Sequence, residues 1–243
     1  MQRLIIDIGN TFTKLAVFNN ESELYAERTT LLQTEILQNL YNRFPKIESS
    51  IISSVRNYPG ELDTWLKTRF YHITLNSQTP LPYNNKYATP ETLGKDRVAA
   101  AAAAIKIFPG HNVLVVDAGT SITYDIVTAR KEYLGGGISP GIRMRLKALH
   151  TFTDKLPLIE NVETAPLPGN NTKESISSGV LNGVLYEVDG FISSYSEQYK
   201  PLKIIISGGD YKYFDKKLKN SIFATPNIVM QGLMEILKFN EDK

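Results

Sequence analysis

The chain has 243 residues, of which 42% are hydrophobic and 21% are charged, and its 27 basic and 25 acidic residues leave a net charge of +2. This length accommodates one large domain or two small ones, and so small a net charge excludes the strong basic field used to bind nucleic acid or membrane surfaces. The lack of cysteine excludes disulfides, thiolate metal sites and cysteine nucleophiles.

The sequence predicts neither a signal peptide nor a membrane span. Asp7 interrupts the only apolar run near the N-terminus, and the longest apolar run, residues 98–105, is far shorter than the roughly 18 residues that a span needs. We therefore expect a cytoplasmic protein.

The first polar cluster lies between two predicted strands, residues 4–6 and 15–18. Gly9 would let backbone N–H groups approach an anion, and Lys14 offers a positive charge to a phosphate. Asp7 would repel phosphate, so we expect it to hold a hydrated Mg²⁺. The alternative is an ordinary hairpin, because Asn and Gly favour turns.

The next segments alternate between predicted strands and helices. Apolar residues at helical spacing predict helices, and short β-branched runs predict strands. The alanine run has high helix propensity, and a Pro-Gly pair ends its helix. We expect strands at 25–30 and 51–55, helices at 34–44, 60–70 and 92–108, and a loop at 80–90.

Residues 113–127 repeat the opening stretch at an offset of 117 − 7 = 110 residues. Asp117 falls on Asp7 and Thr123 falls on Thr13, and apolar residues match apolar residues at both ends. Such self-similarity indicates an internal duplication of one strand–turn–strand unit.

The duplication predicts two related α/β lobes, residues 1–111 and 112–243, whose Asp-Gly turns face each other across a nucleotide cleft. Neither the P-loop pattern nor the dinucleotide-binding pattern occurs. In the second lobe we expect a glycine-rich segment at 133–141, helices at 142–149, 172–195 and 227–239, an irregular loop at 156–168 and a strand at 202–207.

Several motifs resemble those of known phosphotransferases. D-x-G-N-T-x-x-K at 7–14, D-A-G-T at 117–120 and Gly208-Gly209 after a strand resemble the sugar kinase, heat-shock-70 and actin superfamily, whose fold is a duplicated ribonuclease-H-like core. Within it, G-K-D-R at 94–97 and G-G-G-I-S-P-G at 135–141 resemble type III pantothenate kinase. The Thr172 region and the helix with Gly179, Gly183, Glu187 and Gly190 extend this resemblance over nearly the whole chain.

The resemblance implies transfer of the γ-phosphoryl group of ATP to the 4′-hydroxyl of pantothenate, the first step of coenzyme A synthesis. It also implies Mg²⁺, a monovalent cation (K⁺ or NH₄⁺), and a homodimer with active sites at or near the subunit interface.

The resemblance also implies roles for individual residues. Asp96 corresponds to the catalytic base, and Asp117 corresponds to the ligand of the monovalent cation. The ATP contacts are Asp7, Ile8, Gly9, Asn10, Thr11, Phe12, Thr13, Lys14 and Thr120. The pantothenate contacts are Tyr87, Gly94, Lys95, Asp96, Arg97 and Thr172.

The chemistry of the G-K-D-R motif agrees with these roles. The positive end of the alanine-rich helix keeps Asp96 ionised, so that it can orient an alcohol and accept its proton. Arg97 offers a planar fork to the carboxylate of pantothenate. The alternative for Asp96 is a simple charge at a helix N-terminus.

Other assignments stay open between two interpretations. Asp117 could bind K⁺ directly or support Mg²⁺, and Thr172 could contact substrate, cap its helix, or both. Gly179 and Gly183, four residues apart, indicate close packing either with a second copy or within the lobe. His150 could reach pantothenate across the dimer or be structural. The glycines at 135–137 could form a tight turn or permit close approach by backbone or ligand.

Two competing functions can be weighed against the sequence. A sugar kinase or phosphatase on the same fold would not need the arginine beside Asp96, because a sugar is neutral. A non-catalytic binding protein would be expected to have lost at least one of the charged residues Asp7, Lys14, Asp96, Arg97 and Asp117.

Overall fold

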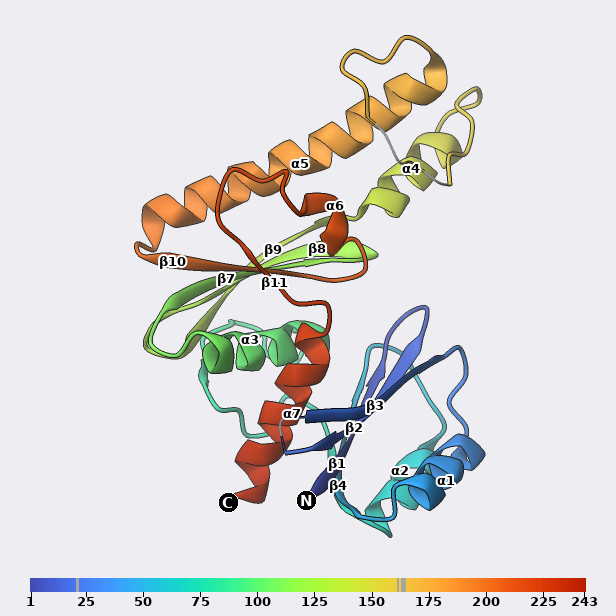
Figure 1. Ribbon diagram of the computed structural model, residues 1–243, viewed down its shortest axis with the longest axis vertical. Coiled ribbons are helices and arrows are strands. Elements are labelled where there is room, and N and C mark those ends of the chain that lie inside the picture. Colours follow the sequence, from blue (N-terminus) through green and yellow to red (C-terminus); the bar gives the residue numbers. More distant parts are fainter. Residues whose placement is uncertain (21, 161, 163–164) are drawn as a thin grey trace. The chain divides into compact units, whose positions relative to one another are not determined.

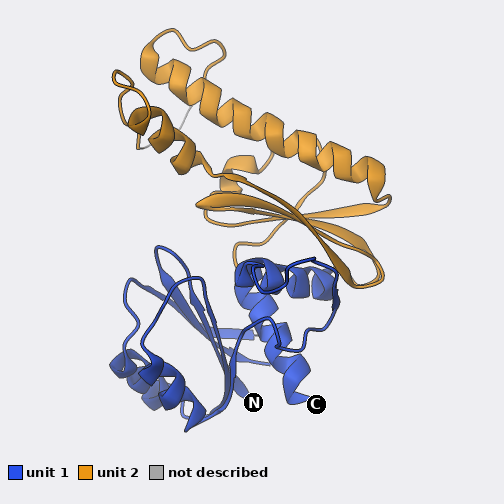
Figure 2. Cartoon of the chain, turned by 180° about the vertical axis from the view of Figure 1, so that it is seen from behind, with its two compact units in different colours: residues 1–107, 228–243 blue, residues 108–227 orange. Residues whose placement is uncertain are grey.

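The computed structural model describes residues 1–20, 22–160, 162 and 165–243. The chain forms two compact units, which Figure 2 shows in different colours: unit 1 comprises residues 1–107 and 228–243, and unit 2 comprises residues 108–227. Residues 161 and 163–164 of the expected irregular loop lie outside the described part. In the described part, no helix has the length and apolar character needed to cross a membrane.

Unit 1 is built on a sheet in the order β3-β2-β1-β4-β5. The first three strands are antiparallel, and β4 and β5 continue parallel to β1. The strands are β1 (Gln2–Ile8), β2 (Thr13–Asn19), β3 (Ser22–Thr29), β4 (Ile47–Ser54) and β5 (Tyr71–Thr74).

Helices cover both faces of this sheet (Figure 1). The side chains of Leu4, Ile6 and Ile8 join one core cluster with residues of α1 and α2. Because side chains alternate along a strand, Asp7 points to the opposite face, where α7 packs on α3, β1 and β4. The remaining elements of unit 1 are α1 (Thr34–Arg43), α2 (Gly60–Lys67), β6 (Asn84–Asn85), α3 (Lys95–Ile107) and α7 (Ile228–Glu241).

Unit 2 repeats this plan. Its strands run in the order β11-β10-β7-β8-β9, and long helix α5 contributes Val184, Val188 and Ile192 to the core over β7 and β8. The elements are β7 (Asn112–Ala118), β8 (Ser121–Val127), β9 (Glu132–Pro140), α4 (Ile142–Thr151), α5 (Thr172–Gln198), β10 (Leu202–Ser207), α6 (Tyr211–Phe214) and β11 (Phe223–Ala224).

The strand orders confirm the predicted duplication. In both units an antiparallel three-stranded meander is followed by two strands parallel to the first of the three. The sequence overlay is nevertheless one residue out in the returning strand. Asp7 pairs with Lys14, seven residues on, whereas Asp117 pairs with Thr123, six residues on. Thr123 therefore takes the place of Lys14, and not that of Thr13 as the overlay predicted.

The two units differ from the expected division into residues 1–111 and 112–243, because the C-terminal helix α7 belongs to unit 1. Gly232 lies so close to α3 that a Cβ there would be 1.7 Å from the carbonyl oxygen of Ala99. The far end of α7 is tied to β1 by a salt bridge of 2.6 Å between Arg3 Nη2 and Glu241 Oε2.

The glycine-rich segment is a strand and not a turn. Residues 135–137 lie within β9, next to β8. A Cβ on Gly136 would lie 1.5 Å from the carbonyl oxygen of Tyr124, so the glycine permits close approach of backbone to backbone. The helix expected at 92–108 begins only at Lys95, and the one expected at 172–195 continues to Gln198.

Candidate active site

The centre of the candidate site in unit 1 is the pair Asp7 and Lys14. The two residues face each other across β1 and β2, and Asp7 is only 9% exposed. Burial raises the pKa of Asp7 to about 6; the charge of Lys14 lowers it, that of Asp96 raises it, and the Ser53 hydroxyl lowers it. The structure therefore brings Asp96 and Asp7 into electrostatic reach of each other, although 89 residues separate them.

The turn between β1 and β2 has an open polar tip. Gly9 N–H donates to the Phe12 carbonyl at 3.0 Å, and Asn10, Thr11 and Phe12 are exposed. The side chain of Thr13 is buried, and its Oγ1 accepts a 3.5 Å hydrogen bond from Arg56.

The first turn of α3 positions Asp96. Its Oδ1 accepts a hydrogen bond of 2.9 Å from the backbone N–H of Arg97, at the helix end where the dipole favours negative charge. A Cβ on Gly94 would lie 2.5 Å from this Oδ1, so the glycine leaves the space that the carboxylate occupies. Lys95, the first residue of α3, is partly exposed.

Tyr87 and Arg97, two of the residues predicted to contact pantothenate, also lie close together. Arg97 is 4% exposed, and its guanidinium carbon lies 5.7 Å from the centre of the Tyr87 ring. A guanidinium stays charged in proteins, and burying it is costly unless the charge is matched. A guanidinium at this place can donate two parallel hydrogen bonds to a carboxylate.

Unit 2 carries the second turn, between β7 and β8. Asp117 is partly exposed at the end of β7, and Thr120 is exposed in the turn. The Asp210 backbone N–H donates to the Ala118 carbonyl at 3.0 Å, next to Gly208, whose φ is +92°. Burial raises the pKa of Asp210 above its ordinary value, against a lowering effect of Arg143.

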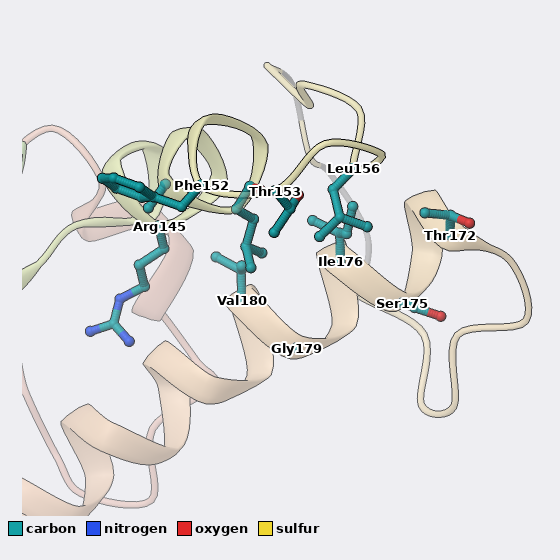
Figure 3. A pocket seen from close by; sticks show the side chains of 11 residues that line it. Arg145, Phe152, Thr153, Leu156, Thr172, Ser175, Ile176, Gly179 and Val180 are labelled. Carbon is teal, nitrogen blue, oxygen red and sulfur yellow. Dashed lines mark hydrogen bonds between the residues drawn. The ribbon is translucent and has the colours of Figure 1, made fainter.

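Thr172 lies apart from this turn, in a groove of about 940 Å³ between α4 and α5 (Figure 3). Asn171 rather than Thr172 caps the helix, because its side chain accepts the Glu174 N–H at 3.0 Å. The groove is lined by Arg145, Ala148, Leu149, Phe152, Thr153, Leu156, Thr172, Ser175, Ile176, Gly179 and Val180.

The structure also bears on two roles that the sequence left open, that of His150 and that of the glycines Gly179 and Gly183. His150 Nδ1 lies 2.8 Å from the Leu156 carbonyl oxygen, which favours the structural interpretation. Among the residues that the structure describes, a Cβ on Gly179 or Gly183 would meet nothing within 4 Å, so packing within the described part of the unit does not require glycine there.

The sequence interpretation missed Ser53, Arg56 and Arg145. Ser53 pairs with Asp7 in the sheet register, and Arg145 lines the groove. Ser53 is one of four serines in the largely buried strand β4, which is an unusual place for a hydroxyl and could have drawn attention. The two arginines carry no local signal, because their contacts lie in other elements.

The carboxylates of unit 1 fit a hydrated Mg²⁺. Within the described ranges, no three His, Cys, Asp or Glu side chains form a cluster that could hold a metal. Mg²⁺ does not need one, because it keeps several waters and is usually held by one or two carboxylates together with phosphates. Burial, and to a lesser extent the charge of Asp96, raises the pKa of Asp7, so the ionised carboxylate is unfavourable here and a cation beside it would stabilise it.

The duplicated fold defines the class of protein. A solved glucokinase from an Antarctic psychrotroph matches with a TM-score of 0.57 at 10% identity, over 98% of this chain and 99% of that one. The chain thus has the fold of the sugar kinase, heat-shock-70 and actin superfamily.

Sequence comparison identifies the family. The model for type III pantothenate kinase matches residues 3–194. The type III pantothenate kinase of Christiangramia forsetii is 46% identical, and that of Phocaeicola vulgatus 43% identical, each over 98% of both chains. The chain belongs to the type III pantothenate kinase family.

Proposed function

We propose that this protein transfers the γ-phosphoryl group of ATP to the 4′-hydroxyl of pantothenate, the first step of coenzyme A synthesis. Besides membership of the family, the observation that carries the proposal is the arrangement at the start of α3. There Asp96 lies within electrostatic reach of Asp7, and the adjacent Arg97 is buried beside Tyr87. This arrangement places a carboxylate next to a guanidinium in the chain, and these are the groups that would contact an alcohol and an acid, respectively.

Asp96 is the proposed base. Its carboxylate orients the 4′-hydroxyl and accepts its proton while the alcohol oxygen bonds to the γ-phosphorus and the bond to the ADP oxygen breaks. Gly94 supports this role, because any side chain there would displace the carboxylate.

Arg97 is the proposed contact for the pantothenate carboxylate, because its fork can donate two parallel hydrogen bonds. The Tyr87 ring at 5.7 Å restricts the guanidinium on one side. Gly94, Lys95 and Thr172 complete the proposed substrate contacts. Thr172 lies in the α4–α5 groove, which is the second region to test for pantothenate binding.

The turn at residues 7–14 is the proposed phosphate contact of unit 1. The exposed turn residues Asn10 and Thr11 and the charge of Lys14 suit phosphate oxygens. Asp7 would hold the Mg²⁺ that neutralises the phosphates when ATP is bound. Because Ile8 and Thr13 are buried, only their backbone can serve the nucleotide.

In unit 2 the proposal assigns Thr120 to ATP and Asp117 to a monovalent cation, K⁺ or NH₄⁺. Carboxylate and carbonyl oxygens are suitable ligands for such a hard cation. Because the reaction consumes ATP within the route to coenzyme A, we place the protein in the cytoplasm.

We also propose a homodimer formed through α5. Gly179, Gly183 and Gly190 present helix surface on which an added Cβ would meet nothing, so a second helix could approach closely. The same helix carries the exposed Tyr186, and aromatic side chains are enriched at interfaces.

The test is a direct assay. Protein, MgATP, KCl and pantothenate should give ADP and phosphopantothenate, with much slower turnover when NaCl replaces KCl. Glucose in place of pantothenate is the matched acceptor for the sugar-kinase alternative. Turnover with glucose but not with pantothenate would refute the proposal, and equal rates in KCl and NaCl would remove the cation assignment.

A further inference from the structure

The turn that carries Thr120 is held in place by the segment that follows β9. Gly141 N–H donates to the Thr120 carbonyl at 3.0 Å, and a Cβ on Gly141 would lie 2.1 Å from the Gly119 carbonyl oxygen. The backbone at Gly141 thus lies directly against the turn and supports it.

Arg145 fixes the residues just before Gly141. Its Nε donates to the Pro140 carbonyl at 2.7 Å, and its Nη2 donates to Ser139 Oγ at 2.6 Å. Both bonds come from a charged donor, and such hydrogen bonds are about twice as strong as neutral ones. Figure 3 shows the Arg145 side chain extending from α4 toward α5.

Glu187 on α5 fixes Arg145 in turn. Arg145 Nη2 donates to Glu187 Oε2 at 2.6 Å, and the hydroxyl of Tyr124 donates to Glu187 Oε1 at 2.8 Å. Burial alone would raise the pKa of Glu187, but hydrogen bonds from Ser139, Arg145 and Tyr124 and the charge of Arg145 lower it. Glu187 is therefore ionised at neutral pH.

Tyr124, which donates to Glu187, is fully buried and lies on β8, the strand that follows the Thr120 turn. The turn is therefore held on two sides. On one side it continues into β8, which carries Tyr124. On the other side it contacts Gly141, and Arg145 binds the residues just before Gly141. Glu187 joins the two sides.

We propose that Arg145 is a positioning residue for the Thr120 turn and sets the affinity of unit 2 for nucleotide. The inference rests on the proposed function, in which this turn contacts ATP. It also gives a physical role to two features that the proposed reaction leaves unused, the Ser-Pro-Gly end of the glycine-rich motif and the glutamate of α5.

The test compares the dissociation constant for Mg²⁺ with a non-hydrolysable ATP analogue, measured by titration calorimetry. Arg145→Met should weaken binding about tenfold, because the loss of about 1.4 kcal/mol is within reach of charged hydrogen bonds. Arg145→Lys keeps the charge but lacks the planar guanidinium whose Nε and Nη2 reach these acceptors, so it should show a smaller loss. Arg130→Lys, an exposed arginine of the same unit, is the control and should bind like wild type.

Glu187→Gln is a second, independent test, because it removes the charge that orients Arg145 without enlarging the side chain. It should weaken nucleotide binding about threefold, and combined with Arg145→Met it should add nothing to the single change. If Arg145→Met does not fold, the nucleotide affinities of Arg145→Lys and Glu187→Gln test the proposal.

Wild-type nucleotide affinity in folded Arg145 and Glu187 variants, with only the melting temperature lowered, would overturn the inference and leave the proposed function standing. Weakened nucleotide binding in a protein that does not phosphorylate pantothenate would support the inference and refute the proposed function.

Discussion

At the scale of single residues, the proposed function needs an ionised Asp7, but ionisation of this buried carboxylate lowers the stability of the fold. Its folded pKa of about 6 exceeds the ordinary value of 3.8. The stability that a raised pKa contributes is fully present below pH 3.8 and is lost as the pH rises through 6. Above pH 6 the ionised carboxylate therefore costs up to about 3 kcal/mol relative to acid conditions.

We predict that Asp7→Asn is more stable than wild type at pH 8 without Mg²⁺, by about 1–3 kcal/mol, and that the difference disappears near pH 4. Urea denaturation at several pH values measures this. The same variant should lose kinase activity and stabilisation by Mg²⁺. Asp154→Asn, at an exposed position, should show neither effect. A destabilised Asp7→Asn at every pH would contradict the argument.

The role of Asp96 is tested by Asp96→Asn. Asparagine keeps the size of the side chain and an oxygen for the Arg97 N–H, so the helix start should survive. Without a proton acceptor, kcat should fall about 10²–10⁴-fold with little change in either KM. Glu91→Gln, an exposed acid just before α3, is the matched control. Substantial activity in Asp96→Asn would refute its role as base.

The role of Arg97 is tested by Arg97→Lys. Lysine cannot pair bidentately, so the KM for pantothenate should rise about tenfold and that for ATP much less. The control is Arg69→Lys, since Arg69 also lies over an aromatic ring, 4.3 Å from the centre of Trp65, but has no proposed ligand. Equal effects on both KM values would count against a carboxylate contact.

Some of these residues could be predicted because their neighbours are local or follow from strand pairing. Asp96 and Arg97 adjoin each other in the chain, and the hairpin brings Lys14 to Asp7. Arg145 could not be predicted, because its partner Glu187 lies 42 residues away on another helix and no local pattern fixes such a contact.

At the scale of elements, periodic apolar patterns predicted the long helices and the buried strands, but not β9. Its three central glycines left open a tight turn or a close approach by backbone or ligand, and in the structure their lack of side chains lets the strand lie against the backbone of β8. The short strands β5 and β11 were also missed, because four and two residues offer no period to detect.

The packing partner of α7 could not be predicted from sequence either, and it leads to a test. Gly232→Ala would place a Cβ 1.7 Å from the Ala99 carbonyl oxygen, so α7 and α3 must separate. We expect a loss of about 1–3 kcal/mol in unfolding free energy, despite the better helix propensity of alanine. Because α3 carries Asp96, kcat should fall as well.

The matched control for this test is Gly60→Ala in α2, where a Cβ would meet nothing within 4 Å. It should leave kcat unchanged and unfolding free energy within about 1 kcal/mol of wild type. Wild-type stability and kcat in Gly232→Ala would show that the α3–α7 contact is not tight.

At the scale of the whole molecule, one folding plan occurs twice with different consequences. The first copy places a lysine opposite its aspartate, while the second places Thr123 there. The first hairpin therefore offers a positive charge to phosphate at a position where the second offers a hydroxyl. The duplication could be predicted, but the overlay kept one offset through the turn and so missed that the second turn is one residue shorter.

The proposed dimer belongs to this scale, because Gly179, Gly183 and Gly190 leave open surface along the 27-residue helix α5. If Gly183 lies where a second α5 approaches, Gly183→Leu must push the copies apart. We expect sedimentation velocity to show a dimer for wild type and mainly monomer for this variant, with circular dichroism unchanged. Gly60→Leu, at another open glycine, should stay dimeric. A dimeric Gly183→Leu would move the interface away from this face, and monomeric wild type would refute the dimer itself.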